Sequence, residues 1–368
     1  MAIPPSKEGK EEIEMTIHLR RVAFLGILGF ALCTTIPSCL AGQSDGMRAA
    51  MAGRNLSAEA ARELELHVQS APDDVDARTK LLGYYWLRSH TSDEARGARQ
   101  QHILWLIRNR PDAAILETPF AHLDAIGESS AYAEGKEAWL AQVSREPKNP
   151  VILGRAAYYL LLNDSAAAES LYQRAEAAEP QNPRWSEQLG HLYALGLSHR
   201  TNGERQKGAK AALDAYERSL GRMHDDEERG ALLSDVAKVA LEAGEIAKAQ
   251  GYAEEMLKTA ESERGSWNYG NMVHHGHLIL GRLALRAGDL DKAKEHLLAA
   301  GDTPGSPQLN SFGPNMTLAK ELLEKGERQA VLEYFKRCGS FWQRAELEAW
   351  SKEVQAGKIP DFGPNLEY

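Results

Sequence analysis

Three imidazoles within four residues are the densest group of possible metal ligands in the sequence. They belong to His274, His275 and His277, and imidazole nitrogens bind zinc and copper. On a helix, however, His274 and His277 share one face while His275 points elsewhere. Because a zinc site needs three or four converging ligands, we expect these side chains to pack and hydrogen-bond between helices. A metal- or ligand-binding module centred on His274 and His277 is the alternative.

Other features that could support catalysis are incomplete. The segment 203–210 has glycines at positions 203 and 208, as a phosphate-binding loop would, but Ala209 stands where that loop has lysine. The same segment lies between predicted helices rather than after a strand. The sequence contains no Gly-x-Gly-x-x-Gly and no His-Glu-x-x-His motif. We therefore predict that the protein is not an enzyme and needs no cofactor.

The N-terminal residues have the pattern of an export signal. Met15 begins a short stretch that ends in Arg20 and Arg21, and residues 22–33 are an uninterrupted run of apolar residues and glycine. This run has the length of a signal-peptide core and is shorter than the roughly 20 residues that span a membrane. An acidic leader precedes Met15, so Met1 and Met15 both stay open as the start. We expect residues 1–42 to be leader and signal peptide and residues 43–56 to be a linker.

Two ways of processing this signal are open. Cleavage after Ala41 would follow small residues at alternate positions. Alternatively, residues 36–39 resemble the bacterial lipobox, with Cys39 as the lipidated residue and Pro37 as a departure from the pattern. We predict a periplasmic or cell-envelope protein, whose only contact with the membrane would be a lipid on Cys39 if that cysteine is lipidated. In either case Cys338 is the one remaining thiol, and we expect it to be buried and inert.

Charge and composition exclude several classes of protein. The chain has 43 Lys and Arg against 52 Asp and Glu, a net charge of −9, so a broad basic surface for nucleic acid is not expected. Hydrophobic residues make up 43% of the chain and aromatic residues only 7%. This composition favours many small contacts between helices over several large hydrophobic cores. Frequent Ala, Leu, Glu, Lys and Arg favour helices.

Proline spacing is the first sign of an internal repeat. Pro72, Pro111, Pro147 and Pro180 end Ala-rich segments and are 39, 36 and 33 residues apart. These intervals bracket the period of about 34 residues of a helix–turn–helix repeat. Such a repeat requires small residues at the positions where the two helices of a pair cross.

The clearest repeat unit covers residues 280–300. Gly281 and Ala293 are small where the helices would cross, and Gly288 and Asp289 are expected to end the first helix and cap the second. The apolar stripe between the two helices would consist of Leu280, Ala284 and Leu297. The same spacing recurs in residues 236–256 and 318–338, and parts of it in residues 60–72 and 168–180.

In this pattern the chain resembles the tetratricopeptide repeat family over residues 57–340. Leu82-Gly83 with Trp86, and Leu189-Gly190 with Tyr193, match its first-helix signature. The resemblance implies an all-α solenoid, a right-handed superhelix of about seven helix pairs. Residues 341–356 are then expected to form a capping helix, and residues 357–368 an extended C-terminal tail.

Several regions depart from the regular spacing. Residues 196–211 are a polar insertion, the helices around residues 88–108 and 113–130 are stretched, and Arg99 stands where a small residue is expected. Near the C-terminus, Phe-Gly-Pro-Asn occurs at residues 312–315 and again at residues 362–365. Because Pro suits the first position of a helix, the first copy should begin a helix over residues 316–325. We expect the second copy to fold back on the last helices, with docking on another molecule as the alternative.

In this family the first helix of each pair lines a concave groove, and the resemblance gives that role to one set of positions. In this sequence they are Lys80, Tyr84, Arg184, Glu187, His191, Lys238, His275, Arg282, Arg286 and Lys320. Since most are basic, we predict a non-enzymatic scaffold whose groove binds an acidic peptide, a C-terminal carboxylate or an anionic polymer. The alternatives are a merely solvated helix face and a groove that the chain's own tail fills.

Overall fold

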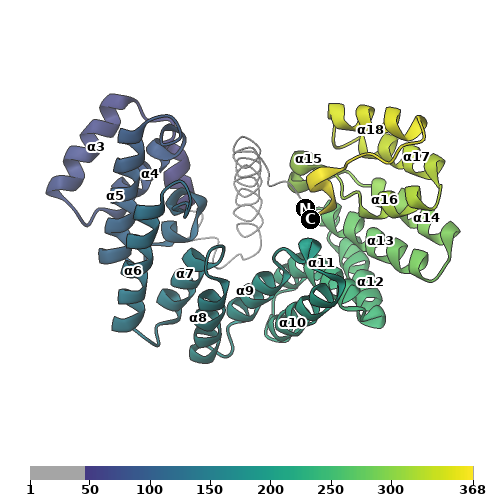
Figure 1. The fold of residues 1–368 in the computed structure, drawn as a ribbon, viewed down its shortest axis with the longest axis horizontal. Helices are drawn as coiled ribbons and strands as arrows, with labels where there is room; N and C mark the ends of the chain where they lie inside the picture. Colours follow the sequence, from purple (N-terminus) through teal and green to yellow (C-terminus); the bar gives the residue numbers. More distant parts are fainter. Residues whose placement is uncertain (1–45, 368) are drawn as a thin grey trace, which may run out of the picture. The chain divides into compact units, whose positions relative to one another are not determined.

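The computed structural model describes residues 46–367. The predicted signal sequence, its cleavage sites and Cys39 lie outside these residues. All regular structure in residues 46–367 is helical, without a strand. The described residues form two compact units that divide between Gln181 and Asn182, and each unit is described by itself (Figure 1).

Unit 1 contains six longer helices after a first helical stretch at residues 46–53. Their bounds are α3 (Ala58–Ser70), α4 (Val75–Arg88), α5 (Asp93–Asn109), α6 (Ser129–Arg145), α7 (Pro150–Leu160) and α8 (Ser165–Ala178), with 3-10 turns η1 (Ala114–Glu117) and η2 (Pro119–Ala121) before α6. From α3 onward, each α-helix of this unit packs on the next one along the chain. The sequence predicts that four prolines mark the ends of helices. Each of them lies two residues after a helix end, which confirms the prediction for Pro72, Pro111, Pro147 and Pro180.

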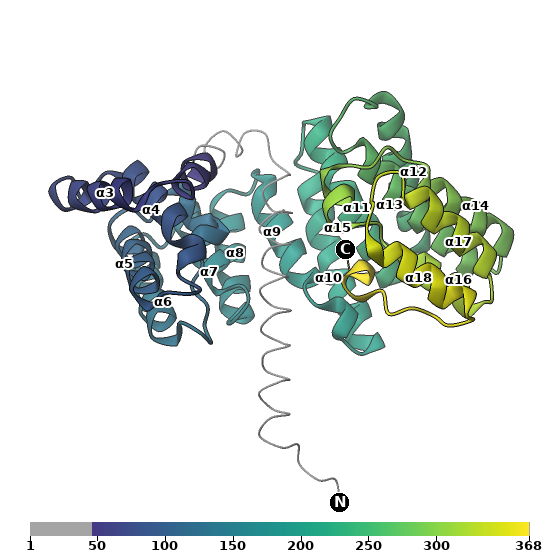
Figure 2. The ribbon, with the colours of Figure 1, turned by 90° about the horizontal axis from the view of Figure 1, so that it is seen from above.

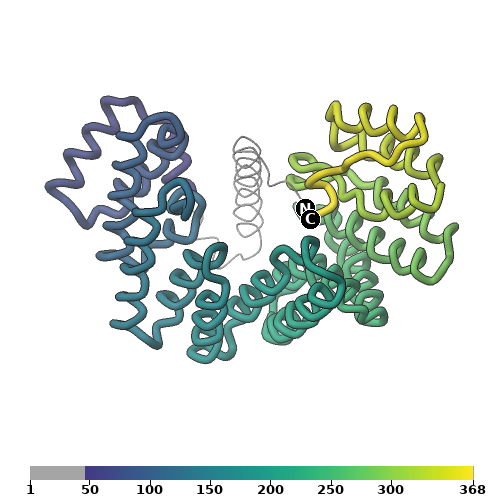
Figure 3. The backbone as a smooth tube through the Cα atoms, viewed as in Figure 1, coloured from purple at the N-terminus to yellow at the C-terminus, as the bar shows by residue number. Residues whose placement is uncertain are grey.

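Unit 2 contains the remaining helices. Their bounds are α9 (Pro183–Ala194), α10 (Asn202–Leu220), α11 (Asp226–Ala243), α12 (Ile246–Ser262), α13 (Tyr269–Arg286), α14 (Leu290–Gly301), α15 (Pro307–Phe312), α16 (Thr317–Glu324), α17 (Arg328–Cys338) and α18 (Ala345–Gln355), with 3-10 turns η3 (Leu197–His199) and η4 (Gly363–Leu366). The tube in Figure 3 shows how the chain doubles back between consecutive helices. The predicted helix over residues 316–325 corresponds to α16, and α18 lies inside the predicted capping segment.

Helices of unit 2 pack in pairs and in layers. Consecutive helices pair as α9 with α10, α11 with α12, and α13 with α14. In addition α11 contacts α13, α13 contacts α16, and α14 contacts α17. We call α11, α13 and α16 the first-helix layer, and α14 and α17 the second-helix layer. Successive pairs therefore stack with like helices as neighbours.

The unit at residues 280–300 forms as its small residues predict. Gly288 has a φ of +84°, a left-handed conformation that suits glycine after a helix end. Asp289 caps α14 by accepting a hydrogen bond from the Lys292 amide at 3.0 Å. A Cβ at Gly281 would clash with Leu318 of the next pair, and Ala293 is fully buried. The crossing and cap predictions are confirmed.

The irregular regions differ in detail from their predictions. α5 is a regular helix, and the irregular part is confined to η1, η2 and the loop that leads to α6. Arg99 of α5 is buried there and donates to the carbonyl oxygens of Phe120, at 3.2 Å, and His122. A large side chain stands at this position because it replaces missing backbone partners in that loop. The polar insertion at residues 196–211 forms η3 and the first half of a longer α10. Thr201 and Glu204 cap the N-terminus of α10.

The two Phe-Gly-Pro-Asn copies bind each other. The Asn365 side chain donates to the carbonyl oxygens of Phe312 and Pro314, at 3.1 and 2.9 Å, and its own carbonyl accepts from the Met316 amide at 2.8 Å. The C-terminal segment, yellow in Figures 1 and 2, runs back from α18 to this place. The tail therefore folds back as expected, although residues 363–366 form a 3-10 turn rather than an extended strand.

The helical stretch at residues 46–53 packs on α4 through two glycines. A Cβ at Gly83 would clash with the Ala50 carbonyl oxygen, and a Cβ at Gly53 would clash with the Lys80 carbonyl oxygen. The backbones of the two helices are thus in direct contact. The sequence predicts a linker at residues 43–56. In the structure, residues 46–53 of this segment form a helix that packs against α4.

We expect Gly83→Ala to destabilise unit 1 by about 1–3 kcal/mol, because the added methyl group forces residues 46–53 away from α4. Amide hydrogen exchange in residues 46–53 should become faster. Gly97→Ala on α5 is the matched control, since no atom lies within 4 Å of its Cβ position; it should be neutral or stabilising by about 0.5–1 kcal/mol. Equal effects of the two changes would contradict the close contact.

The tail should contribute strongly to the stability of unit 2. Phe362 is 1% exposed, and its ring lies 5.1 Å from that of Trp350 and 6.1 Å from that of Phe335. Phe362→Ala is expected to cost about 3–5 kcal/mol in urea unfolding. The nearby Ile359 is 45% exposed, and Ile359→Ala should change stability by less than about 0.5 kcal/mol.

Candidate functional site

The structure divides the predicted groove residues between the two units. Lys80 and Tyr84 lie on α4 of unit 1, and the other eight lie on α9, α11, α13 and α16 of unit 2. Tyr84 is covered by the guanidinium of Arg88, which lies 3.9 Å from the ring centre. Lys80 pairs with Asp76 at 2.6 Å.

Arg282 joins the three helices of the first-helix layer. Its guanidinium on α13 donates to both carboxylate oxygens of Glu321 on α16, at 2.8–3.1 Å, and to Glu242 on α11 at 3.3 Å. Burial disfavours its charge, but Glu321 and Glu242 outweigh burial and raise the pKa of Arg282. Its positive charge is compensated by these carboxylates, so its main role is to connect neighbouring helix pairs.

Arg286 and Lys320 are the remaining cations at the predicted positions on α13 and α16. Arg286 is exposed and donates to the Leu241 carbonyl oxygen at 2.9 Å, while Glu242 lies 3.9 Å away. Lys320 is half-buried and forms no ion pair with any residue in the range 46–367. A carboxylate of another molecule would meet these two side chains more easily than Arg282.

His191 is the centre of a polar cluster between α9 and α10. Its Nε2 lies 3.4 Å from Glu187 Oε1, and its Nδ1 lies 2.9 Å from the Tyr216 hydroxyl. Burial lowers the pKa of His191, but the hydrogen bond and charge of Glu187, with Asp235, outweigh burial and raise it. Glu187 is buried, and its second carboxylate oxygen has no hydrogen-bond partner in the described part of the chain. Glu187 and His191 are thus brought together, as a packed pair rather than two exposed groove residues.

Lys238 and His275 lie deeper than groove residues would. His275 is 8% exposed, and burial, Lys238 and His274 lower its pKa well below the usual range. Burial also lowers the pKa of Lys238, although Asp235 partly offsets this. Arg184 lies 4.7 Å over the ring of Trp185. All three side chains therefore pack against neighbouring groups instead of extending freely into solvent.

The histidines do not form a metal cluster in the described residues. His274 is fully buried and uses both ring nitrogens: Nδ1 lies 2.8 Å from the Ala300 carbonyl oxygen and Nε2 accepts from the Asn315 amide at 3.0 Å. His277 Nδ1 lies 3.1 Å from Nδ1 of His296. No group of three or more His, Cys, Asp or Glu side chains in residues 46–367 is arranged to hold a metal ion. His274 links α13 to α14 and to the segment before α16.

Cys338 lies at a helix contact, as the sequence predicts. It is fully buried on α17, and burial raises the pKa of its thiol well above the usual range. A thiol in this state is a poor nucleophile at neutral pH because so little thiolate is present.

A polar network in unit 1 was not anticipated from the sequence. Glu65 of α3 accepts from the Tyr85 hydroxyl of α4 at 2.8 Å and lies 2.9 Å from His102 Nε2 of α5. The other nitrogen of His102 lies 3.1 Å from Arg78, whose guanidinium stacks 3.7 Å over the ring of Trp105. These groups satisfy one another and connect three helices. No spacing rule within one helix could have identified partners that lie up to 37 residues apart.

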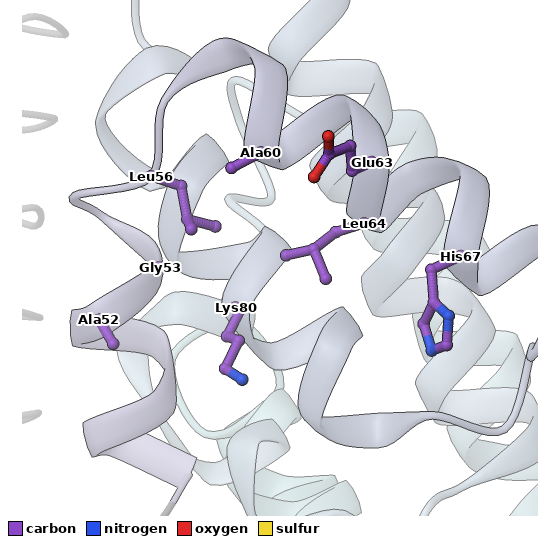
Figure 4. A pocket seen from close by; sticks show the side chains of 8 residues that line it. All are labelled: Ala52, Gly53, Leu56, Ala60, Glu63, Leu64, His67 and Lys80. Atoms are coloured by element: carbon purple, nitrogen blue, oxygen red, sulfur yellow. The ribbon is translucent and has the colours of Figure 1, made fainter.

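An open pocket in unit 1 was also missed, apart from Lys80. Figure 4 shows its lining side chains, which come from residues 46–56, α3 and α4. The lining consists of Ala52, Gly53, Leu56, Ala60, Glu63, Leu64, His67 and Lys80. Its members on α3 follow the spacing of one helix face. That spacing is present in the sequence, where residues 60–72 carry part of the repeat pattern.

Two surface features stand out among the described residues. The first-helix layer presents charged side chains on neighbouring helices, and unit 1 presents an apolar pocket with a charged rim.

Within residues 46–367, no helix combines the length and the apolar character needed to cross a membrane. Comparisons of this chain with models of protein families and with curated proteins find no match.

Acid should destabilise unit 2 through its buried histidines. Burial lowers the pKa of His274 to about 4, and burial together with His296 lowers the pKa of His277 to about 4, whereas an unfolded histidine titrates near about 6.5. Between these values the unfolded chain binds more protons than the folded one, so stability falls as the pH falls from about 6.5 to about 4.

The test compares the slope of unfolding free energy against pH in His277→Gln and the unaltered chain. Each such histidine contributes at most about 1.4 kcal/mol per pH unit, and less where solvent screens it. The variant should therefore have the shallower slope. An unchanged slope would show that His277 takes up no proton on unfolding in this range.

Proposed function

We propose that this chain is an exported, tetratricopeptide-like helical repeat protein that binds another polypeptide in the cell envelope. The observation that carries the proposal is the stacking of first helices, in which α11, α13 and α16 are neighbours. This arrangement gathers the polar side chains of several helices on one layer. Such a layer suits an extended polypeptide, whose residues meet successive helices.

Charge supports an acidic segment of the partner at one part of this layer. Arg286 is exposed and Lys320 is half-buried, and Lys320 pairs with none of the described carboxylates. Arg282 between them is compensated by Glu242 and Glu321. We therefore place the acidic contacts of the partner at Arg286 and Lys320, with Arg282 as a support that holds the helices in register.

Binding of this kind requires neither a cofactor nor a covalent step. The proposed export follows from the apolar run at residues 22–33 after Arg20 and Arg21, and a lipid on Cys39 would hold the protein at the membrane. We propose that the protein acts as a scaffold in the envelope rather than as an enzyme.

Charge reversal on the two layers provides a matched test. Lys320→Glu changes the first-helix layer on α16, and Lys336→Glu makes the same change on α17 of the second-helix layer, where Lys336 is exposed. Affinity-tagged chains would be used to capture partners from envelope extracts, with quantification by mass spectrometry. Lys320→Glu should reduce capture by about tenfold at low salt, because a repulsive contact replaces an attractive one.

Lys336→Glu should capture the same partners as the unaltered chain. Circular dichroism would establish that both variants are folded. Equal capture by both variants would contradict the assignment of the binding surface to the first-helix layer, and no specific capture by the unaltered chain would contradict the proposed function.

A further inference from the structure

The pocket of unit 1 is a preformed apolar site between two short stretches of helix. Residues 46–53 and α3 form its sides, and α4 contributes Lys80. Gly53 touches the Lys80 backbone, so the position of the first side is set by a backbone contact. Because Ala52, Gly53 and Ala60 are small, they leave room next to Leu56 and Leu64. A site that exists before binding loses little entropy when it is filled.

The pocket encloses about 430 Å³ and is lined mainly by apolar side chains, so it has ample room for an aliphatic side chain. Leu56 and Leu64 extend toward the space between the helices in Figure 4. An aliphatic side chain placed there would be removed from water on the sides that Leu56, Ala60 and Leu64 cover. Burial of one Leu, Ile or Met side chain contributes enough free energy to act as an anchor of a peptide.

The charged groups at the pocket are not equivalent. Lys80 pairs with Asp76 at 2.6 Å, and His67 lies 2.9 Å from Asp74, so each of these two has a carboxylate partner. Glu63 is exposed and makes no ion pair with another described residue. Glu59 lies one turn earlier on the same face of α3 and is also exposed. Among the charged residues that line the pocket, the one without a described ion-pair partner is therefore the negative Glu63.

We propose that this pocket binds a segment of a polypeptide partner that inserts one aliphatic side chain and places a neighbouring Lys or Arg against Glu63. The inference rests on the proposed function, because it names the chemistry of the partner at one site of the same protein. It also differs from the acidic contacts proposed for Arg286 and Lys320. A partner that meets both sites has a basic residue next to an aliphatic anchor in one segment and acidic residues in another.

A library of random peptides displayed on phage, selected on the full chain, tests the chemistry of the occupant. Enriched peptides should share a Leu, Ile or Met within about three residues of a Lys or Arg. Binding of one enriched synthetic peptide would then be measured by fluorescence anisotropy. Ala60→Phe, which fills the pocket, should weaken binding by at least about tenfold, and Glu63→Lys should weaken it at low salt but less at high salt.

Matched changes on the same unit serve as controls. Ala166 on α8 and Glu137 on α6 are exposed, and Ala166→Phe and Glu137→Lys should leave peptide binding unchanged. A peptide whose Lys or Arg is replaced by Glu should bind the Glu63→Lys variant more tightly than it binds the unaltered chain. Because Glu63 is at the surface, that variant tests the proposal even if Ala60→Phe disturbs folding.

Other outcomes would overturn the inference. Enrichment of peptides without a basic residue, or binding that neither Ala60→Phe nor Glu63→Lys weakens, would show that the pocket is not the peptide site. Failure to enrich any peptide would also reject the inference. The proposed function is judged separately, by the capture experiment with Lys320→Glu and Lys336→Glu, so the two proposals can fail independently.

Discussion

Direct contact between helix backbones is the constraint on which the rest of this structure depends. At Gly83 and Gly53 a side chain would collide with the backbone of a neighbouring helix, and at Gly281 it would collide with the Leu318 side chain of the next pair. Aromatic residues make up 7% of the chain, and these close helix contacts stabilise the fold together with buried rings such as that of Phe362. Small residues at the crossings also set how one pair is positioned on the next, and thereby which side chains become neighbours on a layer.

Charged side chains take a second structural role once the helices are close. Arg282 connects three helices of the first-helix layer, and Arg99 satisfies carbonyl groups in the irregular part of unit 1. Each guanidinium provides several donors in one plane, which lets a single residue bridge elements that lie far apart in the sequence. The binding surfaces that we propose accordingly use charges that remain after these internal pairings, such as Glu63 and Lys320.

Local features of the fold were predictable from the sequence because their causes are local. Helix ends at Pro72 or Gly288 and the cap at Asp289 depend on residues within one turn, and all of them were identified. The assignment of groove residues was less informative, because it relied on spacing within single helices. Whether Arg282 is exposed to a partner depends on Glu242 and Glu321, which are 40 and 39 residues away. The pocket beside Glu63 requires residues 46–53 to pack on α4, and the backbone contacts at Gly53 and Gly83 show that they do.

The mutual binding of the two Phe-Gly-Pro-Asn copies has a consequence for how the protein is made. Phe362 is synthesised after α16, α17 and α18, yet it fills the space beside Phe335 and Trp350. Translation products that stop before this residue would leave those aromatic rings facing water. Chains truncated before Phe362 would therefore display the kind of apolar surface that chaperones and proteases recognise.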